Sequence, residues 1–245
     1  MEIVITMAGL GKRFREAGYT EPKYMIKACG KTLFEWALES LKAFRRAEDV
    51  YTFIVRKEDN AASFIYEKCK AMEIASHRVL ELKNTTDGQA TTAMLASRSW
   101  NTEDSLLVYN IDTYVEAYEM EPSQIHGDGF IPCFRAEGDH WSFVSVDETG
   151  KAVMVKEKER ISDNCTLGAY YFRTCLMYEE IYNEYYSDAS NLVNGEKYIA
   201  PLYDHMIKKG MKVYISDVDA KKVHVLGTPS ELKDFIDEYD VSKDQ

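Results

Sequence analysis

Short apolar runs alternate with segments of helical periodicity along the first half of the chain. The apolar runs, rich in β-branched and aromatic residues, predict strands over residues 2–7, 49–56, 78–82 and 105–112. Between them, apolar side chains recur every three or four residues, which predicts helices over residues 32–44, 61–72 and 91–100. Thr32 and Glu35 have the spacing of a capping box at the start of the first helix. This alternation predicts an α/β fold with a mainly parallel sheet covered by helices on both faces.

The pattern changes after residue 112, where shorter apolar runs follow one another with turns between them. Strands are predicted over residues 129–136, 141–147, 152–159, 167–173, 212–218 and 221–227, and helices over 176–186 and 198–209. A last helix begins at Thr228, with Pro229 in its first turn and Glu231 at the capping-box position. Because no repeat or low-complexity linker divides the sequence, it predicts one domain over residues 1–245, with a first half at 1–115 and a second half at 116–245.

Composition and charge exclude several classes of partner. The formal net charge of the 245 residues is −11, so the chain would repel the phosphate backbone of a nucleic acid, although a few local cations could still hold one mononucleotide. No apolar run approaches the roughly 20 residues that a membrane span needs. The N-terminus lacks a signal-peptide pattern, and the five cysteines form no CxxC pair. We therefore expect a cytoplasmic protein with reduced thiols and neither a nucleic-acid nor a membrane partner.

A glycine-bearing loop follows the first predicted strand. Such a loop lets backbone N–H groups approach phosphate oxygens, and the cations Arg13 and Lys23 could then neutralise a triphosphate. The third glycine of a dinucleotide-binding loop is replaced by Phe14, and no P-loop is present. A structural turn with two surface cations explains the loop about equally well. The loop residues are Ala8, Gly9, Leu10, Gly11, Lys12 and Arg13.

A second polar group, Asn110 with Asp112, ends the fourth predicted strand. Ligands of open α/β sheets bind beyond the carboxyl ends of the strands, where the loop 8–13 is also expected. A carboxylate in this place can hold Mg²⁺ against a phosphate group. The alternative is that Asp112 only caps a turn.

Two weaker signals lie outside these strand ends. Gly88 and Gln89 precede a predicted helix and could offer polar groups to the edge of a base, or they could form a plain loop. Glu157 and Lys158 lie near a strand end, where the lysine could hold a phosphate, or they could belong to a solvated charge run.

Taken together, these segments resemble the sugar-phosphate nucleotidylyltransferases over nearly all of the chain. "MAGLGKRF" with "PK" looks like the signature loop and phosphate-binding lysine of that family, and "NID" is similar to its metal-binding segment. "VSVDETGKAVMVKEK" resembles its hairpin and EK motif, "LGAYYF" its GxY strand, "NGEKYIAPL" its acceptor-side glutamate segment and "LGTPSEL" its closing turn. The chain is most similar to small members found with capsule-polysaccharide genes, a branch that includes a cytidylyltransferase acting on phosphoglutamine.

This resemblance implies a Rossmann-like, glycosyltransferase-A-like fold with a small added β region that binds substrate. It implies transfer of a nucleoside monophosphate, with CTP favoured as the donor, onto a small phosphorylated acceptor for capsule precursor synthesis, and a homodimer is one candidate assembly. Mg²⁺ is the implied cofactor, with Asp112 as its ligand. The implied catalytic residues are Arg13, Lys23, Asp112 and Lys158. Nucleotide binding is implied for the first half, through Ala8 to Arg13, Lys23, Gly88, Gln89 and Asn110. Acceptor binding is implied for the second half, through Glu157, Lys158, Gly168, Tyr170 and Glu196.

The sequence departs from the family pattern in three places. The signature loop is shorter than the common form, and Glu159 and Arg160 stand where a proline usually follows the EK motif. The family often has a metal-binding aspartate at the position of Val225, for which Asp217 or Asp219 could substitute. Two other functions remain open: a nucleotide-binding regulatory protein without catalysis, and a nicotinamide-dependent oxidoreductase with a similar strand-loop-helix start.

Overall fold

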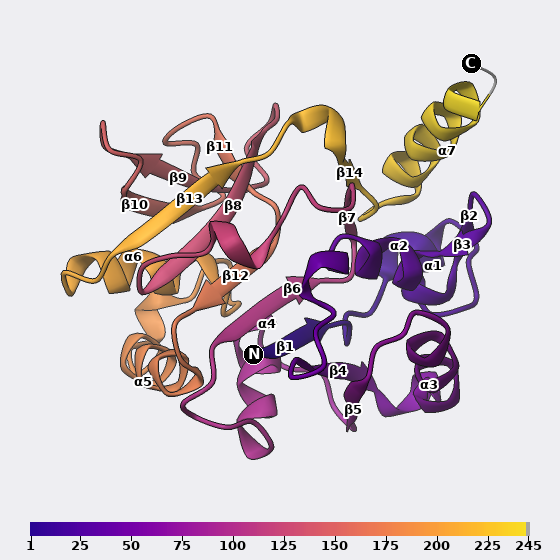
Figure 1. Cartoon of the computed structure of the whole chain (residues 1–245), viewed down its shortest axis with the longest axis horizontal. Helices are drawn as coiled ribbons and strands as arrows, with labels where there is room; N and C mark the ends of the chain where they lie inside the picture. Colours follow the sequence, from indigo (N-terminus) through magenta and orange to yellow (C-terminus); the bar gives the residue numbers. More distant parts are fainter. Residues whose placement is uncertain (244–245) are drawn as a thin grey trace.

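A large mixed sheet runs through the centre of the molecule, with helices on both faces (Figure 1). The computed structural model describes residues 1–243; the last two residues of the predicted domain, 244 and 245, lie outside the described residues. Within that range the strand order is β10-β9-β11-β8-β12-β6-β1-β4-β5, and β13 pairs with β8 beside this path. The predicted α/β fold is confirmed.

The first half of the chain supplies the parallel part of the sheet. β1 (Glu2–Thr6) lies between β6 (Leu106–Asn110) and β4 (Val50–Arg56), and β4 pairs with the edge strand β5 (Ser76–Leu82). Successive side chains of a strand point to opposite faces of the sheet, and each face is covered by its own hydrophobic cluster. Ile3 and Ile5 belong to the first core cluster, and Val4 belongs to the second. All four strands run in the same direction, so their carboxyl ends meet at one edge.

The helices of this half are shorter than the periodicity predicts. α2 (Leu33–Glu39) begins with the predicted capping box, but it ends before the 3₁₀ turn η2 (Lys42–Phe44). The predicted helix 91–100 consists of α4 (Gln89–Met94) and the 3₁₀ turn η4 (Leu95–Arg98). α3 (Ala62–Ala71) is confirmed. The loop after β1 contains a short helix, α1 (Lys12–Glu16), which the sequence pattern did not predict.

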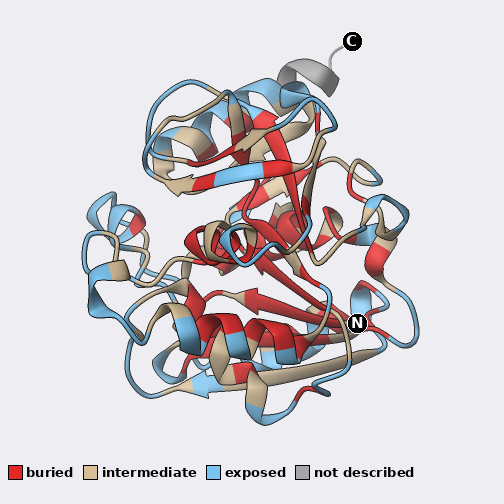
Figure 2. Cartoon of the chain, turned by 90° about the vertical axis from the view of Figure 1, so that its left-hand side faces the viewer, coloured by how far each residue is buried: buried red, intermediate tan, exposed pale blue. Residues whose placement is uncertain are grey.

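The second half extends the sheet with mostly antiparallel strands. These are β8 (Gly129–Arg135), β9 (Ser142–Val146), β10 (Ala152–Glu157), β11 (Asn164–Thr166) and β12 (Ala169–Phe172), and β13 (Val213–Asp217) runs parallel to β8. α5 (Cys175–Tyr185) and α6 (Ala200–Lys208) share the second core cluster with α4. Figure 2 shows the buried strands at the centre and the exposed residues on the outer loops.

The end of the chain returns to the first half. β14 (Val223–Val225) pairs antiparallel with β7 (Thr113–Val115), a strand that directly follows Asp112, and α7 (Pro229–Lys243) comes next. A third core cluster joins α7 to α1 and α2 through Phe14, Trp36 and Phe235. The C-terminal segment is therefore fixed beside the residues that follow β6.

The remaining elements are short. β2 (Lys27–Ala28) and β3 (Lys31–Thr32) form a small hairpin, and the other 3₁₀ turns are η1 (Lys23–Met25), η3 (Lys57–Asp59), η5 (Pro122–Gln124), η6 (Ala189–Asn191) and η7 (Ala220–Lys222). None of the helices within residues 1–243 combines the length and hydropathy that crossing a membrane requires.

Candidate active site

A cleft of about 680 Å³ opens where the carboxyl ends of β1, β4 and β6 meet. It brings together most of the predicted site residues, which come from both halves of the chain. Those that line it are Ala8, Gly9, Leu10, Gly11, Lys12, Arg13, Lys23, Gly88, Gln89, Asn110, Asp112 and Glu196. Four predicted acceptor residues are not part of its lining: Glu157, Lys158, Gly168 and Tyr170.

The glycine loop forms one wall of the cleft. Gly11 has a φ of 61°, a left-handed conformation that glycine adopts without strain, and it is the N-cap of α1. A Cβ on Gly11 would lie 3.7 Å from the Cβ of Lys23, so the loop packs directly against that lysine. Arg13, in α1, and Lys23 both line the cleft.

Lys23 and Asp112 form an ion pair at the centre of the site. The Lys23 Nζ donates to Asp112 Oδ2 at 2.9 Å, and the two side chains are 14% and 39% exposed. Burial alone would raise the pKa of Asp112, but the charge and hydrogen bond of Lys23, with a smaller contribution from Arg13, lower it below its usual value. Asp112 is therefore ionised and partly open to the cleft at neutral pH, as a metal ligand must be.

Asp112 fits the role of a ligand for Mg²⁺ that is held jointly with a nucleotide. Gly227 lies beside it: a Cβ on this glycine would stand in ordinary contact, 3.7 Å from Asp112 Oδ2, and without a side chain the glycine leaves this flank of the carboxylate uncovered. Within residues 1–243, no group of three or more His, Cys, Asp or Glu side chains could hold a metal ion by itself. Mg²⁺ often binds through one or two carboxylates and substrate phosphates, which this donor set allows.

Asp217 and Asp219 were the sequence candidates for a second ligand, and the structure engages both elsewhere. Asp217 is 62% exposed on β13, 4.0 Å from Arg135, and Asp219 caps η7 by accepting from the Lys221 backbone N–H at 3.0 Å. Neither lines the cleft.

The loop before α4 forms the wall where a base is expected. A Cβ on Gly88 would overlap the backbone of Lys197, because the two segments cross closely at this point. The side-chain amide of Gln89 donates to Thr6 Oγ1 at 3.1 Å and to Asn110 Oδ1, so β1 and β6 fix its orientation. Lys197 also forms an ion pair with Asp87 at 2.9 Å, which ties this loop to the segment that carries Glu196.

The predicted acceptor residues form a second group around the end of β10. Lys158 has a φ of 56°, its side chain is exposed, and its ammonium group contacts the Tyr198 hydroxyl and lies 4.4 Å from the ring centroid. Burial raises the pKa of Glu157, whose carboxylate accepts a hydrogen bond from Ser142. Tyr170 is buried and shares a 3.0 Å hydrogen bond with Thr166.

Gly168 supports the nucleotide side of the cleft. A Cβ there would overlap the side chain of Asn110, and the Asn110 backbone N–H donates to Gly168 O at 3.0 Å. Its contacts therefore shape the position of Asn110.

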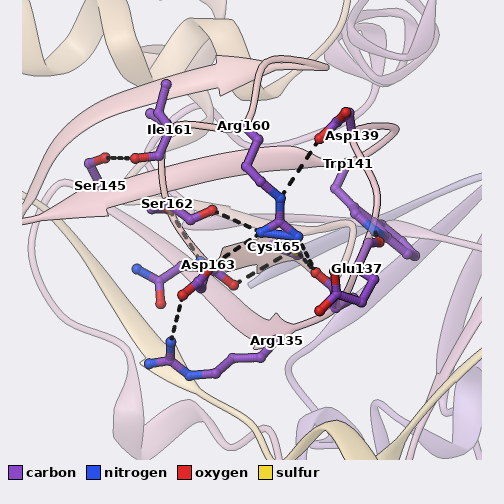
Figure 3. Close-up of polar contacts among 12 residues, drawn as sticks. Arg135, Glu137, Asp139, Trp141, Ser145, Arg160, Ile161, Ser162, Asp163 and Cys165 are labelled. Carbon is purple, nitrogen blue, oxygen red and sulfur yellow. Dashed lines mark hydrogen bonds and ion pairs between the residues drawn. The ribbon is translucent and has the colours of Figure 1, made fainter.

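Arg160 fixes the loop that follows Lys158 (Figure 3). Its guanidinium donates to Ser162 O at 3.3 Å, to Asp163 at 3.2 Å and to Ala136 O, and it lies 5.0 Å from the Phe143 ring centroid. These contacts restrict the loop that follows the EK segment.

We expect Arg160→Ala to loosen this loop while leaving the nucleotide side intact. Losing hydrogen bonds to a charged group costs about 1.5–3 kcal/mol each at buried positions, and the 28% exposure of Arg160 favours the lower end of this range. The acceptor KM should rise more than the nucleotide KM, as measured by steady-state kinetics together with the melting temperature. An equal rise of both KM values would contradict a local role.

Arg56 is a cleft residue that the sequence pattern did not reveal. It ends β4, is 5% exposed, contacts Glu58 and pairs with Asp59 at 2.5 Å, and Asp59 accepts from the Tyr24 hydroxyl at 3.0 Å. Ligands of open α/β sheets bind beyond the carboxyl ends of the strands. Because Arg56 ends β4, this rule could have identified it from the sequence.

Solved structures of known proteins are similar to this chain over nearly all of its length. No protein-family model and no curated protein sequence matches the chain. Among solved structures, a nucleoside-diphosphate-sugar pyrophosphorylase from Vibrio cholerae RC9 is 37% identical, with a TM-score of 0.89 over 96% of this chain and 99% of that one.

More distant structures share the fold. An inositol-1-phosphate CTP transferase from T. maritima is 15% identical, with a TM-score of 0.74 over 94% of this chain and 90% of that one. A CTP:phosphocholine cytidylyltransferase from Streptococcus pneumoniae is 16% identical, with a TM-score of 0.72 over 97% and 98%. With 37% identity over almost the full length of the Vibrio protein, this chain belongs to the nucleotidyltransferase family that includes the nucleoside-diphosphate-sugar pyrophosphorylases.

Proposed function

We propose that this protein transfers a nucleoside monophosphate, with CTP as the favoured donor, onto a small phosphorylated acceptor and releases pyrophosphate. The observation that carries the proposal is the meeting of Arg13, Lys23 and Asp112 in one cleft with Glu196 from the second half of the chain. Sugar 1-phosphates and similar phosphate monoesters, including phosphoglutamine, are the acceptors we favour. Capsule or surface polysaccharide synthesis in the cytoplasm is the proposed context.

The chemistry requires positioning and charge neutralisation more than an activated side chain. A phosphate monoester is largely dianionic near neutral pH, so its oxygen can attack the α-phosphorus without a protein base. The bond from the α-phosphorus to the bridging oxygen breaks, and its electron pair leaves with pyrophosphate. Arg13 would stabilise the charge that develops on this leaving group, and Lys23 would bind the nucleotide phosphates.

Asp112 and Lys158 complete the proposed assignment. Asp112 would hold Mg²⁺, which when bound neutralises phosphate charge and fixes the phosphate geometry. Lys158 is exposed, and its ammonium group would exchange the Tyr198 hydroxyl for the acceptor phosphate. Gly88 and Gln89 would meet the base, since Gln89 is already oriented by Thr6 and Asn110.

The decisive experiment is a matrix of the four nucleoside triphosphates against a panel of phosphorylated acceptors, read by pyrophosphate release. The panel should contain sugar 1-phosphates, inositol 1-phosphate, phosphocholine and phosphoglutamine. Release that depends on both substrates supports the proposal. If the protein binds triphosphates but releases pyrophosphate with no pair, it is better described as a nucleotide-binding regulatory protein without catalysis. The observation that favours this second candidate is Val225, which stands where an acidic metal ligand is expected.

We expect CTP to exceed GTP by roughly 10²-fold or more in kcat/KM. A site that hydrogen-bonds a base edge rejects a mismatched base because its buried polar groups are left unpaired. Two of the structural neighbours are CTP-dependent transferases, which supports the choice of base. The measurement is kcat/KM for each triphosphate with the best acceptor, and equal values for GTP and CTP would contradict it.

A further inference from the structure

Val225 has no acidic side chain and cannot be a second metal ligand. The residues that follow it in the chain, however, are held against Asp112. Its strand β14 pairs with β7, with Val225 opposite Thr113, and its side chain packs against the hydrophobic core. The next residue, Leu226, is buried, and its backbone N–H donates to Asp112 O at 2.8 Å. The turn from β14 into α7 is therefore bonded directly to the residue that carries the proposed metal ligand.

Gly227, at this turn, faces three charged groups. A Cβ on this glycine would stand 3.1 Å from Glu231 Oε2, 3.7 Å from Asp112 Oδ2 and 4.0 Å from Lys23 Nζ. Gly227 is not among the described glycines with positive φ, so its backbone conformation does not require glycine. What the glycine provides is space between two carboxylates and an ammonium group.

Glu231 reaches this space from the first turn of α7. Its backbone N–H donates to Thr228 Oγ1 at 3.2 Å, which confirms the predicted helix cap. Its Oε2 is buried and has no hydrogen-bond partner. A buried polar atom without a partner has lost its hydration without compensation, so the position is unfavourable without a ligand.

The groups around Glu231 Oε2 indicate the charge and the chemical class of the partner that this oxygen lacks. Lys23 donates to Asp112 Oδ2, which leaves the Glu231 oxygen uncompensated. An anion would be repelled by two carboxylates, whereas a hard divalent cation prefers oxygen ligands of this kind.

We propose that Glu231 is the second carboxylate of the metal site and that, together with Asp112, it holds the divalent cation of the bound metal–nucleotide. It takes the role for which the family uses an aspartate at the position of Val225. The inference rests on the proposed function, because the cation enters with a nucleoside triphosphate. The proposed ligand lies in the first turn of α7, whereas the family pattern places it in the strand that precedes this helix.

Binding of Mn²⁺ in the presence of CTP tests the assignment without reference to turnover. Free Mn²⁺ is measured by electron paramagnetic resonance for the wild type, Glu231→Gln, and Glu238→Gln as the matched control. Glu238 lies on the same helix, but its side chain is 71% exposed and lies 3.9 Å from His224, which is outside the cleft lining. CTP binding in EDTA and the melting temperature of the metal-free protein are measured in parallel.

We expect Glu231→Gln to weaken Mn²⁺ binding by at least roughly 10- to 100-fold, since losing a residue that merely supports a metal ligand already has an effect of this size. Glu238→Gln should stay within about twofold of the wild type. CTP binding in EDTA should not weaken in Glu231→Gln, and the metal-free melting temperature should hold or rise because a buried unpaired charge is gone. Glu231→Ala should show the same loss of Mn²⁺ binding if the glutamine variant folds poorly.

Three results would overturn the inference. Mn²⁺ affinity in Glu231→Gln equal to that of Glu238→Gln would remove Glu231 from the site. If CTP binding in EDTA weakens in Glu231→Gln as much as Mn²⁺ binding does, Glu231 acts by positioning Lys23 and not as a metal ligand. If the wild type binds none of the four triphosphates with Mn²⁺, the proposed function fails and this inference with it, which is distinct from the first two results.

Discussion

Asp112→Asn is expected to reduce pyrophosphate release by roughly 10³-fold or more, with little loss of fold. The substitution keeps the shape of the side chain but removes the charge, and charge neutralisation by a metal is worth several kcal/mol in a reaction of this kind. Lys23 would also lose its ionic partner at 2.9 Å. Turnover at saturating Mg²⁺ and the circular dichroism spectrum measure the two effects separately.

Asp217→Asn and Asp219→Asn are the controls for this experiment, since both remove one negative charge outside the cleft lining. Each should retain turnover near that of the wild type. If either is as damaging as Asp112→Asn, a metal ligand lies there instead. If Asp112→Asn leaves turnover unchanged, the metal assignment is wrong, and the alternative of a nucleotide-binding regulatory protein gains support.

Arg13→Ala and Lys23→Ala should each lower kcat/KM by roughly 10²- to 10³-fold while the protein stays folded. Both cations are expected to contact phosphate oxygens whose charge changes in the transition state, and losing one preorganised donor typically has this effect. Lys23→Ala should in addition raise the pKa of Asp112, because the charge of Lys23 is the main influence that lowers it.

Lys27→Ala is a suitable control for both variants, because Lys27 is exposed and lies outside the cleft lining. Steady-state kinetics with the substrate pair selected by the matrix, together with the melting temperature, provide the comparison. Near-normal turnover in Arg13→Ala or Lys23→Ala would remove that residue from the proposed catalytic group.

Family membership also decides between the enzyme classes that the sequence left open. A strand-loop-helix start is shared by dinucleotide-binding folds and by this family, so the first 25 residues alone did not separate them. The 37% identity over almost the whole length sets aside the nicotinamide-dependent oxidoreductase. The choice of base and acceptor stays a proposal, since such contacts depend on backbone position and shape.

The sequence by itself determined the features that rest on local periodicity. Strands β1, β4 and β6 and helix α3 lie where alternation and helical spacing predict them, because burial on one or both faces imposes these patterns on the residues. Thr32 with Glu35, and Thr228 with Pro229, mark helix starts through side-chain spacing alone. The meeting of the loop 8–13 with Asp112 also followed from the sequence, since parallel strands direct their carboxyl ends to one edge of the sheet.

The tertiary structure decided everything that depends on pairing between distant segments. β7 and β11 are three residues each, too short for a periodic signal, and they form because a partner strand lies beside them. The pairing of β7 with β14 joins residues more than 100 positions apart and thereby sets Gly227 and Glu231 next to Asp112. No local pattern encodes such an approach: the sequence predicts a helix-capping role for Glu231, and only the tertiary structure places its unpartnered carboxylate oxygen beside Gly227.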